Sequence, residues 1–316
     1  MANRLTNFRL LSERIVRALE KETPLVSVVI PCYNHAQFVQ RTIQSVIDQD
    51  YKNIELIIID DGSSDETANV IRRFIASCIN RFERLEFRSR PNKGLTATLN
   101  EALSWCRGKY YSLIASDDIM MDRKISIQVD YLESNRECAA VFGGMLLINN
   151  EEGVVGKLLQ EREHSFEELI SLRNLPYTPS ALLRASSIVA AGGYDEGVKI
   201  EDWDMWLKLS YAGHKLMSCN DIVVKYRTHP GNMSKQIIFM HEERMKILKK
   251  YEGADIYSTA AQLVEFAGLK SIAIRDAKYA IAAVCNSKSI NLFQASFVFL
   301  LALSPRFVFR ALRKWF

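Results

Sequence analysis

Residues 110–120 read YYSLIASDDIM, and this stretch determines how the rest of the chain is interpreted. Its apolar and aromatic first half predicts a buried strand, which ends at Ser116 and is followed by the carboxylates of Asp117 and Asp118. Neighbouring residues of a strand point to opposite faces, so both carboxylates reach one site only where the chain turns. Such oxygen ligands suit a hard divalent cation, which in turn suits a diphosphate. The alternative is that Asp118 only caps the following helix.

Three earlier segments show the same kind of buried apolar run. The expected strands are therefore 26–30, 56–59, 85–88 and 110–115. Because helical patterns separate them, the sequence predicts an α/β fold with a mostly parallel sheet flanked by helices. Five side chains follow these strand ends: Tyr33, Asp60, Asp61, Asp117 and Asp118. Ligands of parallel sheets bind at the carboxyl ends of strands, so we expect these side chains at one site.

The second half has a less regular pattern. The further elements that we expect are a helix at 125–132, a strand at 139–148, a helix starting at Ser165, a short strand at 180–183 and a helix at 201–213. Residues 226–234 read as a loop, and only helices are expected from about residue 236. Ser63 followed by Glu66 is a capping-box pattern, which predicts a helix start there.

Composition excludes several classes of protein. Apolar residues make up 48% and charged residues 25% of the chain, as in an ordinary globular protein. Lys and Arg number 41 against 37 Asp and Glu, an excess too small to indicate nucleic-acid binding. Six cysteines without paired spacing read as reduced core residues of a cytosolic protein: Cys32, Cys78, Cys106, Cys138, Cys219 and Cys285.

Tyr33 and the pair Asp60-Asp61 form one candidate group. The ring of Tyr33 offers a flat face to a nucleobase, and the carboxylates can accept hydrogen bonds from a base or a ribose. The alternative is that Tyr33 packs on the sheet edge and the two aspartates organise a turn.

Acidic and basic side chains of the second half form another candidate group. Glu201 and Asp202 open a predicted helix, whose dipole favours a charged carboxylate and keeps its pKa low. Asp202 against a sugar hydroxyl would act as a general base; the alternative is a simple helix cap. His229 and Arg227 suit a phosphate or a metal ion, although a lone histidine is more often structural.

The two ends of the chain bear on membrane association. The N-terminus lacks the long apolar stretch of a signal peptide, and the apolar segment 290–303 is too short and too polar for a membrane span. Residues 296–316 combine aromatic and aliphatic side chains with four cations, Arg306, Arg310, Arg313 and Lys314. This composition suits the surface of an anionic membrane, and the alternative is a core-packed helix with a solvated basic end.

Several of these motifs occur together in one family. In order they are VSVVIPCYN (26–34), IIIDDGSSD (57–65), NKG (92–94), SDD (116–118), EDWDMW (201–206) and YRTH (226–229). This series resembles glycosyltransferase family 2, the inverting nucleotide-sugar enzymes with the GT-A fold, over roughly residues 25–235. The resemblance implies a glycosyltransferase domain at 25–235, with a nucleotide-sugar half at 25–120 and an acceptor half at 121–235. A helical arm at 1–24 and a helical region at 236–316 would flank it.

The resemblance also implies roles for individual residues. Pro31, Tyr33 and Asp61 would hold the nucleobase, and Asp117 would contact the ribose or the donor sugar. Asp118 would ligate Mn²⁺ or Mg²⁺ on the diphosphate, with His229 as a further candidate ligand. Asp202 would deprotonate the acceptor hydroxyl, so that the sugar leaves UDP with inversion at the anomeric carbon.

The chain departs from the family pattern at two positions. Ala115 stands where many relatives have an Asp, which leaves Asp117 and Asp118 as alternative metal ligands; we favour Asp118. Leu99 stands where many have an Arg that contacts the diphosphate, and Lys93 or Arg227 is expected to supply that contact instead.

The helical tail makes the chain similar to bacterial enzymes of O-antigen or capsule synthesis. A UDP-sugar donor, a saccharide acceptor linked to a polyprenyl diphosphate, and a cytosolic location on the inner face of the plasma membrane are the corresponding expectations. The rival functions are a nucleotide-sugar-binding domain without activity and a nucleotidyltransferase. The PCYN loop carries no phosphate cradle, which argues against the nucleotidyltransferase, and no strand is followed by the G-x-G-x-x-G of a dehydrogenase.

Overall fold

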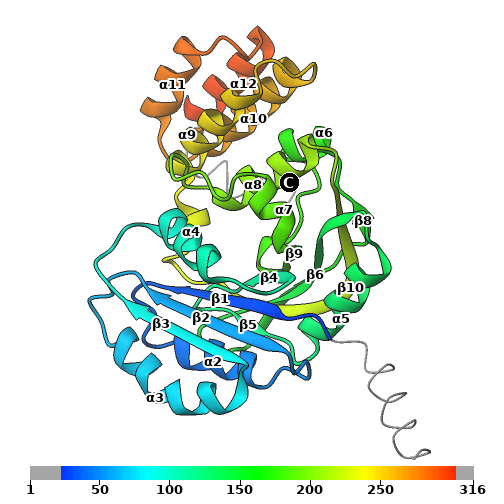
Figure 1. The fold of residues 1–316 in the computed structure, drawn as a ribbon. Coiled ribbons are helices and arrows are strands. Elements are labelled where there is room, and N and C mark those ends of the chain that lie inside the picture. Colours follow the sequence, from blue (N-terminus) through cyan, green and yellow to red (C-terminus); the bar gives the residue numbers. More distant parts are fainter. Residues whose placement is uncertain (1–22, 304–316) are drawn as a thin grey trace, which may run out of the picture.

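The computed structural model describes residues 23–303 of the chain, so the predicted helical arm at 1–24 and the basic end of the tail lie almost wholly outside the described residues. One mixed sheet forms the centre of the molecule, in the strand order β3-β2-β1-β4-β9-β6-β10-β5, with β7 paired to β6 and β8 paired to β10 (Figure 1). Its strands are β1 (Val26–Cys32), β2 (Ile54–Asp60), β3 (Arg84–Ser89), β4 (Tyr110–Leu113), β5 (Ile119–Met120), β6 (Cys138–Ile148), β7 (Val154–Leu158), β8 (Arg162–Glu163), β9 (Leu182–Arg184) and β10 (Lys215–Arg227).

The first four strands confirm the parallel α/β half of the prediction. β2 and β4 flank β1, β3 follows β2, and all three pairings are parallel. β1 and β2 are buried along almost their whole length, as their β-branched runs require. β9 then joins β4 and β6 antiparallel, so the second half of the sheet is mixed.

Strand β10 is the main element that the sequence prediction missed. It runs parallel to β6 and antiparallel to β5, and its register against β6 shifts at several points. Those bulges interrupt the strict alternation by which a strand is recognised in sequence. Tyr226 and Arg227, predicted in a loop, are instead the last residues of this strand, and His229 follows just beyond it.

Helices cover both faces of the sheet. On one face α2 (Val39–Ile47), α3 (Thr67–Arg81) and α5 (Lys124–Ser134) pack into one apolar core. On the other face α4 (Leu95–Trp105), α6 (Phe166–Ile170), α7 (Ala185–Ala190) and α8 (Glu201–Tyr211) pack into a second core. Three short 3₁₀ turns complete this part: Thr178–Ser180, Met233–Lys235 and Lys249–Tyr251.

The two predicted helix caps have different outcomes. The Ser165 hydroxyl accepts a hydrogen bond from the Glu168 N–H at 3.3 Å, which confirms the cap of α6. The capping box at Ser63 and Glu66 is wrong, because α3 begins only at Thr67 and the Asp65 carboxylate accepts from the Thr67 N–H at 3.0 Å. Ser63 donates to Asp60 instead.

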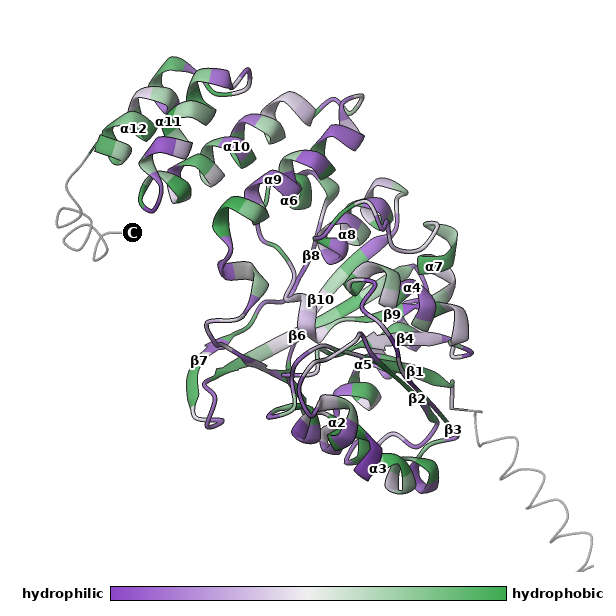
Figure 2. Cartoon of the chain, turned by 90° about the vertical axis from the view of Figure 1, so that its left-hand side faces the viewer, coloured by the Kyte–Doolittle hydropathy of each residue, from purple (hydrophilic) through white to green (hydrophobic). Residues whose placement is uncertain are grey.

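The C-terminal part is helical, as predicted. α9 (Ile237–Leu248), α10 (Tyr257–Ala273), α11 (Ala277–Asn286) and α12 (Leu292–Leu303) stack beside the sheet domain (Figure 1). The residues that join α10, α11 and α12 form a third, small apolar core. Figure 2 shows the largely hydrophobic colouring of α12. Within residues 23–303, none of the helices combines the length and the hydropathy that crossing a membrane requires.

Candidate active site

Two adjoining cavities lie where β1 and β4 end. The first, of about 440 Å³, is lined by Pro31, Tyr33, Asp61, Asp117 and His229 among others. The second, of about 470 Å³, reaches from Asp117 and Asp118 to Glu201 and Asp202 at the start of α8. Residues lining both cavities are Pro31, Leu95, Ala115, Asp117, Asn232 and Met233. The two cavities therefore form one cleft, with Asp117 at their junction.

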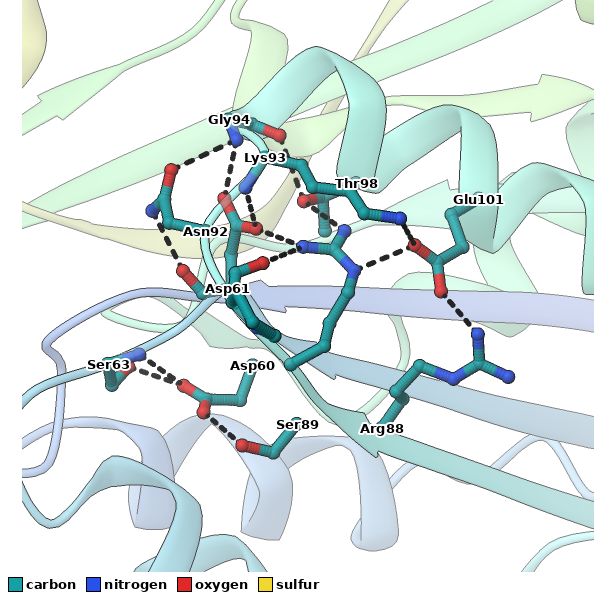
Figure 3. Close-up of polar contacts among 12 residues, drawn as sticks. Asp60, Asp61, Ser63, Arg88, Ser89, Asn92, Lys93, Gly94, Thr98 and Glu101 are labelled. Atoms are coloured by element: carbon teal, nitrogen blue, oxygen red, sulfur yellow. Dashed lines mark hydrogen bonds and ion pairs between the residues drawn. The ribbon is translucent and has the colours of Figure 1, made fainter.

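Asp61 organises the loop that forms one wall of the first cavity (Figure 3). Its carboxylate accepts from the backbone N–H groups of Lys93 at 2.8 Å and Gly94 at 2.9 Å, and it pairs with the buried guanidinium of Arg90. Gly62 makes the turn possible, because its φ is +76° and a Cβ there would lie 2.6 Å from the Asn92 nitrogen. Both carboxylate oxygens are thus engaged within the protein, and Asp61 fixes the shape of the wall.

Of the other residues predicted to hold the donor, some line the first cavity and others do not. Pro31 and Tyr33 line the first cavity, and the Tyr33 side chain is 51% exposed. Lys93 lines neither cavity; its side chain is 59% exposed, with Nζ 3.8 Å from Glu101. Lys93, predicted to contact the diphosphate, therefore lies outside the walls of both cavities.

Two histidine side chains from distant parts of the chain converge at Asp117. The His229 Nε2 lies 2.9 Å from Asp117 Oδ2. His35, on the loop after β1, lies edge-on to His229 with ring centroids 6.0 Å apart, and its Nδ1 is 2.8 Å from the Ser116 hydroxyl. One ligand atom from each of His35, Asp117 and His229 falls within 4.8 Å of the others, an arrangement that could hold a metal ion.

Asp118, which we expected to be the main metal ligand, does not belong to that group. Its Oδ1 accepts a hydrogen bond from the Arg227 backbone N–H at 2.8 Å, and its Oδ2 is buried without a partner. Burial and the neighbouring Asp117 carboxylate raise the pKa of Asp118 well above its usual range. The turn between β4 and β5 presents Asp117 to the histidines, whereas the hydrogen bond from Arg227 holds Asp118 against β10.

Arg227 also differs from its expected role in binding the diphosphate. Its side chain is 1% exposed and lines neither cavity. Nε donates to the Asp117 carbonyl at 2.8 Å, and Nη1 donates to the carbonyls of Asn149 at 3.0 Å and Asn150 at 2.9 Å. The guanidinium also stacks on the Phe38 ring at 4.6 Å. Arg227 therefore holds the end of β10 against the loop that carries Asp117.

Glu201 and Asp202 begin α8, as the predicted helix requires, and both line the second cavity. Two tryptophans anchor this end of the helix: Trp203 Nε1 donates to the Leu169 carbonyl at 2.8 Å, and Trp206 Nε1 to the Thr178 hydroxyl at 3.2 Å. The expectation of a low pKa is wrong, because burial outweighs the helix dipole and raises the pKa of Asp202. Burial and the Asp202 charge also raise the pKa of Glu201.

Sequence reasoning missed three residues of the cleft region: His35, Arg90 and Arg244. His35 directly follows the PCYN motif, and the capacity of histidine to ligate metals was the only signal. Arg90 precedes the NKG loop, and its position beside Asp61 depends on the pairing of β2 with β3. Arg244 comes from α9 and lines the second cavity, a contact that no local pattern indicates.

Comparison with known proteins identifies the family of the chain. The family model described as glycosyl transferase family 2 matches residues 27–181. A putative glycosyltransferase EpsE of Bacillus subtilis is 31% identical over 208 residues, which cover 65% of this chain and 73% of that protein. A chondroitin synthase of Escherichia coli is 28% identical over 240 residues, 75% of this chain; the matched part spans only 34% of the synthase.

Solved structures extend the comparison to the fold. S. aureus TarS 1–349 in complex with UDP-GlcNAc superposes with a TM-score of 0.62 at 14% identity and 92% coverage of both chains. The mannosyltransferase PcManGT of Pyrobaculum calidifontis, in complex with GDP-Man and Mn²⁺, gives a TM-score of 0.57 at 15% identity and 93% coverage of both. The family match and this architecture together place the chain in glycosyltransferase family 2, with the GT-A fold.

Proposed function

We propose that the chain transfers a sugar from a UDP-sugar to a hydroxyl of a saccharide acceptor, with inversion at the anomeric carbon. The main support for this proposal is the single cleft that joins Tyr33 and Asp117 at one end to Asp202 at the other. In this proposal the nucleotide occupies the first cavity and the reacting hydroxyl lies beside Asp202. Residues 25–120 then serve as the nucleotide-sugar half, 121–235 as the acceptor half, and 236–316 as a helical region.

Asp202 is the general base of the proposed reaction. Its carboxylate removes the proton of the acceptor hydroxyl as the oxygen attacks the anomeric carbon and the bond to UDP breaks. A raised pKa makes the carboxylate a stronger base, provided that it remains deprotonated at the working pH. One displacement of this kind inverts the anomeric centre without a covalent sugar–enzyme intermediate.

The residues around Asp117 fit the divalent metal that GT-A enzymes use. His229 and His35 bring neutral nitrogen ligands close to the Asp117 carboxylate, a donor set that suits Mn²⁺ better than Mg²⁺. A bound divalent ion would neutralise charge on the departing diphosphate. Asp117 and His229 are thus the proposed main ligands, with His35 as a third and Asp118 positioning the segment.

The donor is tested by product analysis. The protein is incubated with Mn²⁺ and a panel of UDP-, GDP- and ADP-sugars, and nucleoside diphosphate release is followed with water or added saccharides as acceptor. Release of UDP alone, and a product of inverted anomeric configuration by NMR, is the expected result. Release of GDP alone would overturn the uridine assignment, and absence of release together with tight UDP binding would favour the binding protein without activity.

Tyr33→Ala is expected to weaken UDP binding by about 10-fold without loss of stability. A base stacked on an aromatic ring contributes about 1–3 kcal/mol, and the exposed Tyr33 ring contributes little to the core. Calorimetric titration of UDP against both proteins measures the change, and Tyr33→Phe, which keeps the ring, is the matched control. Equal affinities of Tyr33→Ala and the wild type would remove Tyr33 from the nucleobase site.

We also propose that α12 attaches the protein to an anionic membrane surface, where a polyprenyl-linked acceptor would be found. Five side chains of α12 are exposed: Leu292, Phe293, Ser296, Leu300 and Leu303. They lie within one 100° arc at helical spacing, whereas Val298 on the other side packs into the third core. Four cations follow in sequence, in residues 304–316.

Replacing the four exposed apolar residues of α12 with Gln is expected to lower partitioning onto vesicles of phosphatidylglycerol and phosphatidylethanolamine by at least 10-fold. The substitutions leave the buried Val298 in place, so the fold is retained. Vesicle co-sedimentation measures partitioning, and Ile79→Gln, an exposed apolar residue of α3, is the control. Unchanged partitioning of the α12 variant, or of a chain truncated after Ser289, would contradict the proposal.

A further inference from the structure

Within residues 23–303, Arg244 is a cation of the proposed active site that has neither a hydrogen bond nor a close ion pair. It lies on α9, the first helix of the C-terminal helical region, and its side chain lines the second cavity together with Glu201 and Asp202. Among the described residues it makes no hydrogen bond, and no carboxylate comes within the 4.0 Å of an ion pair. Partial burial lowers the pKa of Arg244, and the Asp202 charge offsets part of that effect.

Two other cations near this cleft have internal partners. Arg227 is bound by backbone carbonyls. Lys250, also close to α8, pairs with Asp195 and Asp204 at 2.6 Å each. Within residues 23–303, Arg244 is the one basic side chain that lines the second cavity, whose remaining charges are carboxylates. A partly desolvated guanidinium is costly without a partner, so its position favours a ligand that supplies one.

Arg244 lies away from the first cavity, which is the one proposed for the nucleotide. The two cavities meet at Asp117, but Arg244 lines only the second cavity, on the side of Asp202. Asp202 itself accepts a hydrogen bond from the Trp203 N–H at 2.6 Å. A guanidinium binds carboxylate and phosphate oxygens in a bidentate manner.

We propose that Arg244 binds an anionic group, a carboxylate or a phosphate, on the acceptor substrate. This inference rests on the proposed function, because it places the acceptor beside Asp202. The acceptor is then an acidic saccharide or a saccharide phosphate, whose charge sets the reacting hydroxyl against the base. Arg244 is thus a specificity-determining residue contributed by the C-terminal helical region.

The test uses the full chain as wild type, Arg244→Met and Arg244→Lys. Ligand-observed NMR measures the affinity of three probes: methyl glucuronide, methyl glucoside 6-phosphate and neutral methyl glucoside. Each titration is run with and without UDP and Mn²⁺. We expect the wild type to prefer at least one acidic probe over the neutral probe by about 10-fold or more. Arg244→Met should lose that preference, Arg244→Lys should retain part of it, and the Kd for UDP should change less than twofold.

Lys246→Met is the matched control, because Lys246 lies on the same helix with a side chain that is 54% exposed and lines neither cavity. Equal binding of acidic and neutral probes by the wild type, or a preference that survives in Arg244→Met, would overturn the proposal. A tenfold loss of UDP affinity in Arg244→Met would assign Arg244 to the diphosphate instead. A further titration compares UDP-glucuronate with UDP-glucose. If Arg244→Met weakens only the affinity for UDP-glucuronate, the anionic group belongs to the donor and the acceptor assignment is wrong.

These outcomes remain distinct from a failure of the proposed function. Should the wild type bind no UDP, the donor assignment fails, whereas the probe titrations without nucleotide still report on Arg244. Thermal melting of all variants checks that they fold. Arg244 has no hydrogen bond to lose within the part of the chain that the structure describes, so the melting temperatures should agree.

Discussion

The variant Asp202→Asn is expected to lose about 10²–10⁴-fold in kcat, while its affinity for UDP stays within about twofold of the wild type. An amide has nearly the shape of a carboxylate, but it cannot take the proton of the acceptor hydroxyl. Asp202 lines only the second cavity, so nucleotide contacts in the first cavity are retained. Steady-state transfer kinetics and calorimetric titration of UDP measure the two quantities separately.

The pH dependence of the wild type provides a second readout of the same group. Burial raises the pKa of Asp202, and a base acts only when deprotonated, so transfer is lost as the pH falls through this raised pKa. The acidic limb of kcat/KM should therefore lie above the pH at which an ordinary aspartate titrates. It should be absent from the residual activity of Asp202→Asn.

Glu201→Gln is the control for Asp202→Asn. Glu201 is adjacent and buried, and burial together with the Asp202 charge raises its pKa to about 8, so Gln replaces a carboxyl group that is largely protonated where Asp202 titrates and should leave the acidic limb in place. Its kcat should remain within about tenfold of the wild type. A full loss of activity in Glu201→Gln, with activity retained in Asp202→Asn, would transfer the role of base to Glu201.

The second large effect is expected at Asp117. Replacing Asp117 with Asn should reduce the Mn²⁺-dependent part of UDP affinity by about 100-fold, since even second-shell changes at metal sites cost about 10–100-fold. His229→Ala should act in the same direction, because its Nε2 lies 2.9 Å from Asp117 Oδ2. Calorimetric titration of UDP is carried out once with Mn²⁺ and once with EDTA in its place. The difference between the two affinities is the part of UDP binding that depends on the metal.

Asp118→Asn is the matched comparison. The Asn Oδ1 can still accept from the Arg227 N–H, and the other oxygen of Asp118 has no partner to lose. We therefore expect a change in Mn²⁺-dependent UDP affinity of less than about tenfold and little change in melting temperature. The opposite pattern would restore Asp118 as the main metal ligand: loss of the Mn²⁺-dependent UDP affinity in Asp118→Asn, and an unchanged affinity in Asp117→Asn.

Much of the fold was predictable because its signals are local. The β-branched runs of β1 and β2 identify strands buried on both faces, and strand ends followed by Tyr33, Asp61 and Asp117 locate a ligand edge in any parallel sheet. The start of α8 at Glu201 is equally local. By contrast, the bulges of β10 break the two-residue period, so its sequence does not resemble a strand.

The sequence by itself determined the α/β class, the strand ends that carry the cleft and the acidic residues Asp117 and Asp202. Only the tertiary structure decided which atoms those residues face. Asp117 meets His35 and His229 because strands and loops distant in sequence converge there, and Arg227 is buried because β10 crosses beside Asp118. The pKa of Asp202 rises through burial by surrounding elements, and Arg244 arrives from a separate helix. Periodicity and capping act over a few residues, whereas burial and convergence depend on the whole packed chain.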